Sequence, residues 1–407
     1  MNGVRAPARG HGAFLQVSWS RFGSWLLPDN GAMTSMPALD GLRALAVGLV
    51  LLFHAWNQQP DFLAAGQWEE RYPMYYARTG VHLFFVLSGF LLFLPYARWL
   101  LHEGGRPSAA RFYKRRALRV GPAYLVCLTV LTLAGPRTLA AAADWLLHTT
   151  FLFNLLPQSM FTINGVFWTM AVEVQFYLLL PALAWLTYAL SSRTGPLKAT
   201  VTLVACLTAI SFASSLAGRS LDPGNDRVLL TGLLGPRSVT YFLSVFGAGI
   251  GCSVAYAHLS RSRSAKPSEA SRLMWAGSGI FLLGVGLGTA LVFTSAISAS
   301  FGRNSLFGLV YASVLFGILF GAPLLRRPFE LRPVRFLGLI SYSFYLWHLV
   351  VLAALMPSLH HLANSTDRLA LGVVASLLGA VPIAYLSYLL SERPFIGARR
   401  RAHDPAF

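Results

Sequence analysis

Charged side chains are scarce in this sequence. Only 12% of its 407 residues are Asp, Glu, Lys or Arg, whereas soluble domains carry about 25%. Hydrophobic residues make up 55% of the chain, and the mean hydropathy is +0.55. This composition excludes an ordinary soluble globular protein and predicts an integral membrane protein.

Cysteine is scarce as well, with Cys127, Cys206 and Cys252 as the only three. All three lie within or beside long apolar segments and share no metal-ligand spacing. We therefore predict no metal site and expect these side chains to pack against their neighbours.

We also predict no cleavable signal peptide in the N-terminal region. Residues 1–36 contain no compact apolar core followed by a small-residue cleavage site. The segment FLQVSWSRFGSWLLP could form an amphipathic helix at the membrane interface. It could equally be a disordered leader, or sequence upstream of a true start at Met33 or Met36.

Long apolar segments, in contrast, are abundant. A hydrocarbon core of roughly 30 Å needs about 20 apolar residues per helix, and an apolar piece at 144–156 is too short for that. We interpret 144–156 as a half-buried or re-entrant segment. Ten spans are predicted, near 38–57, 80–100, 119–135, 167–190, 199–217, 238–258, 273–297, 305–324, 336–357 and 369–390.

The net charge of +18 would by itself suit a nucleic-acid partner, but the basic residues are sorted by topology. If ten spans alternate from a cytoplasmic N-terminus, 24 of the 33 Lys and Arg fall in inner segments, 8 in outer loops, and Arg43 within the first span. This positive-inside bias places both termini in the cytoplasm and argues against nucleic-acid binding. The fold class is therefore predicted as an all-α polytopic membrane protein.

No repeat or linker separates a second folded unit. We expect residues 1–36 to form the leader or interfacial helix, residues 37–396 a single transmembrane domain, and residues 397–407 a basic cytoplasmic tail. The longest inner loop leads into the third span through YKRRALRVGP, where Arg115, Arg116 and Arg119 cluster. These arginines either satisfy the positive-inside rule or bind phosphate through their forked donors.

Two ionisable residues share one face of the first span, LDGLRALAVGLVLLFHAW. Eleven helical steps bring His54 to within about 20° of Arg43 and separate the two by roughly 16 Å along the axis. Ionisable residues inside a membrane helix are functional candidates because they are costly to insert. The pair suits an elongated ligand with an anionic head and a reactive end. The alternative is a snorkelling arginine and a packed histidine.

Glu173, in the fourth span, is expected at a depth similar to that of His54. A carboxylate beside an imidazole would fix its tautomer and stabilise its protonated form. A purely structural glutamate, neutral or bonded to backbone, is the alternative.

The ninth span places Ser341, Tyr345 and His348 on one helix face. They could line a cavity, or they could serve only as interhelical hydrogen-bonding groups. In the second span, Ser88 and Gly89 are expected at the depth of His54, mainly as packing residues.

Six segments together resemble the acyltransferase-3 family of bacterial multispanning acyltransferases. They are LDGLRALAVGLVLLFHA, GVHLFFVLSGFLL, FYKRRALRVGPAY, FWTMAVEVQFYLLLP, GLISYSFYLWH and SERPF, and they cover the chain from about Pro37 to Phe395. Each segment alone is a weak apolar pattern, whereas their order is specific.

The resemblance implies transfer of acyl groups from acyl-CoA to hydroxyls of glycans or small molecules. It implies that Arg43 and His54 are an essential pair with His54 catalytic, and that Glu173 is the family's buried acid. The three arginines at 115, 116 and 119 look like its basic cluster. The chain departs from the family at His82 and Val174, where acids are common, so His82 becomes an additional candidate.

These features favour an O-acyltransferase of the bacterial cytoplasmic membrane. Acyl-CoA, expected to be acetyl-CoA, would be the donor substrate rather than a bound cofactor, and no metal is expected. A glycan, lipid-linked sugar or secreted small molecule would be the acceptor. The alternatives are a transporter or flippase whose polar residues line a path, and a scaffold in which Arg43 and His54 would tolerate substitution.

Overall fold

The computed structural model describes residues 36–59, 73–136, 138–220, 232–265, 267–293, 303–362 and 364–397. Within these residues, ten helices are long and apolar enough to cross a bilayer, and no strand occurs. The chain is thus an all-α protein with ten candidate spans, as the hydropathy predicts. The expected leader, except for its last residue, and the expected tail beyond Gly397 lie outside the described residues.

All the elements of the described chain are helical. They are α2 (Pro37–Asn57), η1 (Pro73–Thr79), α4 (Gly80–Leu100), α5 (Ala109–Ala134), α6 (Leu139–Thr149), η2 (Phe153–Leu155), η3 (Pro157–Ser159), α7 (Phe167–Thr194), α8 (Pro196–Ser220), α10 (Val239–Ala265), α11 (Pro267–Phe293), α12 (Arg303–Phe320), α13 (Pro323–Glu330), α14 (Arg332–Leu339), α15 (Ser341–Leu355), η5 (Met356–Leu359), α16 (Ser365–Ser387), the π-helical segment η6 (Tyr388–Glu392) and α17 (Arg393–Gly397).

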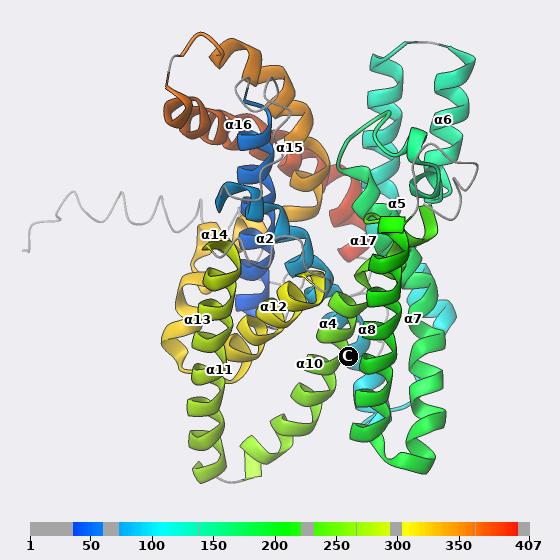
Figure 1. The fold of residues 1–407 in the computed structure, drawn as a ribbon, viewed down its shortest axis with the longest axis vertical. Coiled ribbons are helices and arrows are strands. Elements are labelled where there is room, and N and C mark those ends of the chain that lie inside the picture. Colours follow the sequence, from blue (N-terminus) through cyan, green and yellow to red (C-terminus); the bar gives the residue numbers. More distant parts are fainter. Residues whose placement is uncertain are drawn as a thin grey trace, which may run out of the picture.

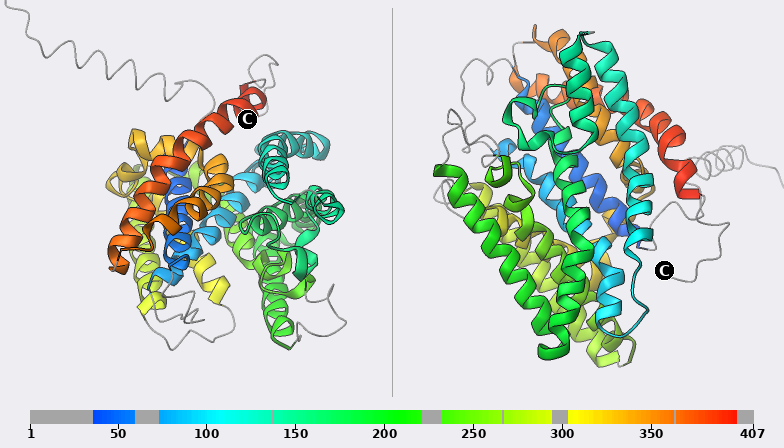
Figure 2. Two further views of the ribbon diagram at one scale, coloured as in Figure 1. Left: turned by 90° about the horizontal axis from the view of Figure 1, so that it is seen from above. Right: turned by 90° about the vertical axis from the view of Figure 1, so that its right-hand side faces the viewer.

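The spans divide into central and peripheral helices (Figures 1 and 2). In the most apolar window of each span, 78% of residues are buried for η1 with α4, 67% for the span that contains α10 and 61% for α2, but only 17% for α8 and for α11. Apolar side chains that are exposed on an isolated membrane domain face lipid, so α8 and α11 belong to the rim. The site must therefore be sought around α2 and α4.

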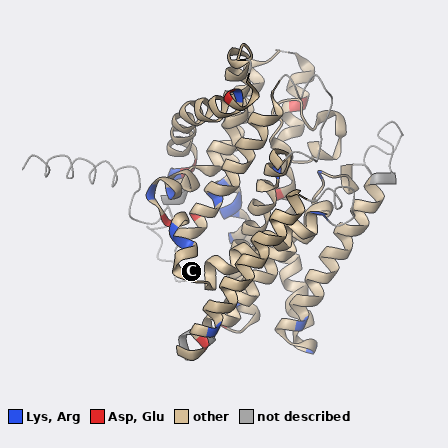
Figure 3. Cartoon of the chain, turned by 60° about the vertical axis from the view of Figure 1, so that its left-hand side comes forward, with Lys and Arg blue, Asp and Glu red and all other residues tan. Residues whose placement is uncertain are grey.

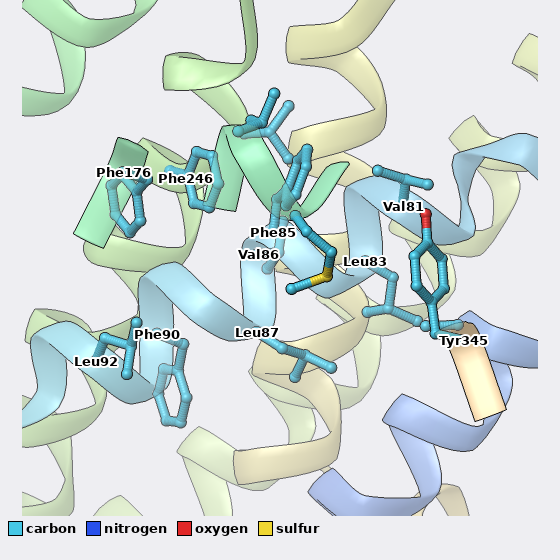
Figure 4. Close-up of a cluster of buried hydrophobic side chains, with 14 of the residues drawn as sticks. Val81, Leu83, Phe85, Val86, Leu87, Phe90, Leu92, Phe176, Phe246 and Tyr345 are labelled. Carbon is cyan, nitrogen blue, oxygen red and sulfur yellow. The ribbon is translucent and has the colours of Figure 1, made fainter. Parts of the chain in front are cut away.

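The core surrounds α4 (Figure 4). Phe85 stacks on Phe246 of α10 with ring centroids 4.6 Å apart, and Phe246 stacks on Phe176 of α7 at 3.8 Å. A methyl group added at Gly89 would lie 2.3 Å from the carbonyl oxygen of Phe246. Only a residue without a side chain lets α4 and α10 approach this closely, as the predicted packing role of Gly89 requires.

Two segments differ from the predicted spans. The ninth span was expected to begin near 336, but α14 ends at Leu339 and α15 begins at Ser341, because Ile340 leaves the helical region at φ −90° and ψ 4°. The expected re-entrant piece at 144–156 comprises the end of α6 and the short turn η2. It forms no crossing helix.

Charge is confined to few places on the described chain. Most helix shafts carry neither acidic nor basic residues, and the basic residues lie at several separate places along the ribbon (Figure 3). The cytoplasmic placement of both termini stays a prediction.

Candidate functional site

Two histidines from distant parts of the sequence meet between α2 and α15. The Nδ1 atom of His54 lies 3.0 Å from the Nε2 atom of His348, with ring centroids 5.1 Å apart. His348 is fully buried, whereas His54 is half-buried. His54 is therefore the member of the pair that a substrate can reach.

The backbone of α15 fixes which nitrogen carries the proton. The Nδ1 atom of His348 lies 2.8 Å from the carbonyl oxygen of Tyr345, and a carbonyl can only accept a hydrogen bond. Neutral His348 therefore holds its proton on Nδ1 and accepts at Nε2. It follows that His54 donates from Nδ1 and keeps a lone pair on Nε2, which is the state of a general base.

Aromatic side chains surround this pair. Phe53 packs edge-on against His54 at 5.2 Å and against Tyr75 of η1 at 6.4 Å, while Phe344 lies parallel to His348 at 5.9 Å. Such walls limit the access of water and leave the imidazoles few alternative orientations.

The other two residues of the predicted α15 face, Tyr345 and Ser341, are buried. The hydroxyl of Tyr345 lies 2.7 Å from that of Thr169 on α7 and donates to the carbonyl of Val166. Ser341 is 3% exposed. All three residues of this face are buried, which favours interhelical contacts over direct substrate binding. Their contacts with acyl-CoA stay a prediction.

Glu173 makes its hydrogen bond with a different partner from the one we predicted. The Ser88 hydroxyl donates to its Oε1 at 2.5 Å.

The packing of η1 and α4 on α2 shows how deep this contact lies. Tyr75 packs beside Phe53 and Trp56, and a methyl group at Gly80 would meet the Ala46 carbonyl at 2.3 Å.

These contacts show that α4 runs antiparallel to α2 and begins beside Ala46 and Val50, about 6–12 Å along α2 from His54. Ser88 is a further two turns away, so the prediction that Glu173 and Ser88 share the depth of His54 is wrong. The contact predicted for Glu173 is made by His348, and a catalytic role for Glu173 stays a prediction.

Arg43 lies at the Glu173 end of the site. It donates to Asp40 Oδ1 at 3.0 Å, and the charges of Glu173 on α7 and Arg119 on α5 both act on it. The structure thus brings Arg43 and Arg119, predicted from separate segments, into one region. Their side chains are 27% and 30% exposed, so neither side chain is fully buried.

A buried carboxylate that sequence reasoning did not single out completes this region. Glu392 is fully buried, pairs with Arg119, and accepts from the Ser343 hydroxyl at 2.6 Å. Glu392 lies in the π-helical segment η6, a geometry often found at functional sites. Its place in the SERPF segment was the available signal.

The remaining basic residues are half-buried at the start of α5. The charge of Arg116 acts on Tyr177, one helical turn from Glu173. Arg115 is half-buried beside it. The arrangement thus places basic side chains around Arg43 and an imidazole about 16 Å further along the same helix.

The additional candidate His82 lies apart from this arrangement. Its Nε2 atom lies 2.8 Å from Asn304 Oδ1, and its ring packs on Phe242 and Phe307. Among the described residues, no group of His, Cys, Asp and Glu side chains is arranged to hold a metal ion. Cys127 is fully buried, but Cys206 is exposed, so the packing prediction fails for Cys206.

Comparisons with known proteins identify the family. Residues 36–388 match the acyltransferase domain family, acyltransferase-3. The chain is 29% identical over 393 residues to nodulation protein 10 of Rhizobium leguminosarum bv. viciae, a match covering 88% of this chain and 93% of that protein.

Two O-acetyltransferases are also similar. Identity is 26% over 386 residues to the peptidoglycan O-acetyltransferase OatA of Listeria monocytogenes, covering 88% of this chain and 55% of that protein. It is 26% over 333 residues to the O-acetyltransferase OatA of Staphylococcus aureus, covering 77% and 50%. The chain therefore spans about half the length of these two relatives. No solved structure matches.

Proposed function

Because the chain belongs to the acyltransferase-3 family, we propose that it is a membrane O-acyltransferase that moves an acetyl group from acetyl-CoA to a glycan hydroxyl. The names of the relatives that act on peptidoglycan support a glycan acceptor, and the family supports residence in a bacterial cytoplasmic membrane. The observation that carries the chemistry is the hydrogen bond from His54 to His348.

His54 acts as the general base in this proposal. Its Nε2 takes the proton of the acceptor hydroxyl while the hydroxyl oxygen attacks the thioester carbonyl carbon. The carbon–sulfur bond then breaks, and the departing thiolate takes the proton back from His54. The products are an ester and free CoA thiol, and His54 returns to its neutral state.

His348 is a positioning residue rather than a reacting one. It accepts a hydrogen bond from the Nδ1–H group of His54 and so orients the Nε2 atom of His54 toward the acceptor hydroxyl. When His54 becomes charged, this hydrogen bond becomes charge-assisted and stronger. General acid–base help of this kind contributes typically about 10² to 10⁴ in rate.

The donor's phosphates bind at the arginine end of the site. Arg43, Arg116 and Arg119 supply planar, forked donors that match phosphate oxygens, and Arg115 adds positive charge at the same entrance. The extended pantetheine arm covers the roughly 16 Å from Arg43 to His54.

Glu173 belongs to the donor region in this proposal. Because its charge acts on Arg43 and its hydrogen bond goes to Ser88, it limits the net positive charge there. This role replaces direct contact with His54.

Thiol release tests the function. Full-length protein in lipid nanodiscs, supplied with acetyl-CoA and purified peptidoglycan strands, should release free CoA thiol in proportion to ester formed on the glycan. A thiol reagent measures the first product, and mass spectrometry of the strands measures the second. A transporter releases no thiol.

If peptidoglycan strands stay unmodified, mass spectrometry of surface glycans and secreted metabolites from cells with and without the protein identifies the acceptor. Identical acylation in the two kinds of cell would contradict the proposal.

A further inference from the structure

A cavity of about 230 Å³ opens at the N-terminal end of α5, and none of the candidate-site residues described above lines it. Its walls come from the last turns of α4, the loop that leads into α5, and the middle of α7. The residues that matter for its chemistry are Tyr96, Trp99, Arg106, Ser108, Pro181 and Trp185. Ligand pockets for whole drug-sized molecules measure about 300–1,000 Å³, so this cavity suits one end of a longer ligand.

Two of the walls are aromatic. Trp99 is stacked on Tyr188 with ring centroids 3.9 Å apart and planes inclined by 12°, which holds its indole in place. Trp185 is 52% exposed. The guanidinium of Arg106 lies 6.0 Å from the centre of the Trp99 ring. Indole faces beside a guanidinium are the groups on which nucleic-acid bases stack.

The third wall attracts anions. Ser108 is the N-cap of α5 and accepts from the amide of Arg111 at 3.4 Å, so the cavity faces the start of a 26-residue helix. The first amides of a helix have no acceptor within the helix and favour a phosphate.

A buried hydroxyl provides an independent indication of a ligand. Tyr96 is 4% exposed and lines the cavity. Within the part of the chain that the structure describes, its hydroxyl has no hydrogen-bond partner. A buried hydroxyl left unpaired costs free energy unless a ligand satisfies it.

Packed aromatic side chains link the wall of the cavity to the candidate site. Tyr96 packs against Phe112 at 6.2 Å, and Phe112 packs against Tyr177 at 6.5 Å. Tyr177 in turn lies beside Glu173 and Arg116. Tyr96 is two helical turns, about 12 Å, beyond Ser88 on the side away from His54.

We propose that this cavity binds the adenosine 3′-phosphate end of the donor. The adenine ring lies against Trp185 and the edge of Trp99, the 3′-phosphate meets Arg106 and the start of α5, and the Tyr96 hydroxyl donates to the nucleotide. This assignment rests on the proposed function, because it identifies the donor as a CoA thioester.

Binding of the nucleotide alone tests the assignment separately from catalysis. Adenosine 3′,5′-bisphosphate is titrated into full-length protein in phosphatidylcholine nanodiscs, and tryptophan fluorescence reports binding. Trp185→Ala should weaken binding by roughly 5- to 150-fold, as removal of one stacking partner does, whereas Trp185→Phe should retain it. Trp275→Ala is the matched control, because Trp275 is 71% exposed on the rim helix α11.

The Arg106→Ala variant should lose affinity for the bisphosphate but not for adenosine. Both alanine variants should raise the KM for acetyl-CoA by the factor seen in binding and leave kcat unchanged. Unchanged affinity for the bisphosphate in both alanine variants would overturn the assignment. A tryptophan fluorescence change that phosphatidylglycerol causes and the nucleotide does not would also overturn it.

Failure of the two proposals is distinguishable. Transfer with an unchanged KM in both alanine variants overturns the pocket and leaves the function standing. Binding that Trp185→Ala weakens, together with identical acylation in cells with and without the protein, supports the pocket and overturns the proposed function.

Discussion

Replacing His348 by alanine tests how His54 is held. The substitution removes the acceptor that lies 3.0 Å from His54 Nδ1 and leaves that N–H unpaired among aromatic rings. A neutral hydrogen bond is worth about 1 kcal/mol, and one to a charged group about 1.5–3 kcal/mol. The variant therefore loses about 0.5–2 kcal/mol of transition-state stabilisation as His54 becomes charged, and at about 1.36 kcal/mol per factor of ten kcat should fall about 2- to 30-fold.

The KM for acetyl-CoA should stay unchanged in this variant. His348 is fully buried and in this account touches no part of the donor. Initial rates of CoA-thiol release across a range of acetyl-CoA concentrations separate kcat from KM. A raised KM with unchanged kcat would instead support the prediction from sequence that His348 binds acyl-CoA.

His148→Ala is the matched control for His348→Ala. His148 is equally buried and stacks on Phe153 at 4.0 Å, but it lies in α6, away from the histidine pair. Both variants should lower the thermal stability, and only His348→Ala should lower kcat per folded molecule. Equal kcat values in the two variants would refute the positioning role.

Three further substitutions test the surrounding structure. Arg119→Ala leaves the fully buried Glu392 without its ion-pair partner, which should cost about 3–5 kcal/mol of stability. The melting temperature in detergent should recover when Glu392→Gln is added to this variant. Gly89→Ala should destabilise the protein because its Cβ would lie 2.3 Å from a backbone carbonyl, whereas Gly279→Ala, with nothing within 4 Å, should not. Glu173→Gln should lower the KM for acetyl-CoA, because it removes the negative charge that acts on the first-span arginine; a loss of kcat instead would restore its predicted role beside the base.

The sequence was sufficient to predict the spans because each depends on local composition. Apolar length alone identifies α2, whose bounds Pro37–Asn57 differ by one residue from the predicted segment. The division between α14 and α15 escaped prediction because Leu339 and Ile340 are as apolar as the span that follows. A single non-helical residue at such a place leaves no mark in hydropathy.

The site was only partly predictable because helix periodicity describes one helix at a time. It places Tyr345 and His348 on one face of α15, but it does not say which helix that face meets. The partnership of His54 with His348 joins residues 294 positions apart.

Depth was misjudged for a related reason. Counting residues from the predicted membrane surface assumes that all spans begin at one level. In the structure, α4 begins beside Ala46 in the middle of α2, and this offset separates Glu173 from His54.

The most direct test of the account is the rate of acetyl transfer after His54→Ala. With acetyl-CoA and peptidoglycan strands, or the acceptor that mass spectrometry identifies, thiol release should fall by about 10² to 10⁴ while binding of adenosine 3′,5′-bisphosphate is kept. His360→Ala, at an exposed histidine just beyond α15, should transfer at the wild-type rate. Transfer by His54→Ala at the rate of His360→Ala would contradict the assignment of His54 as the base.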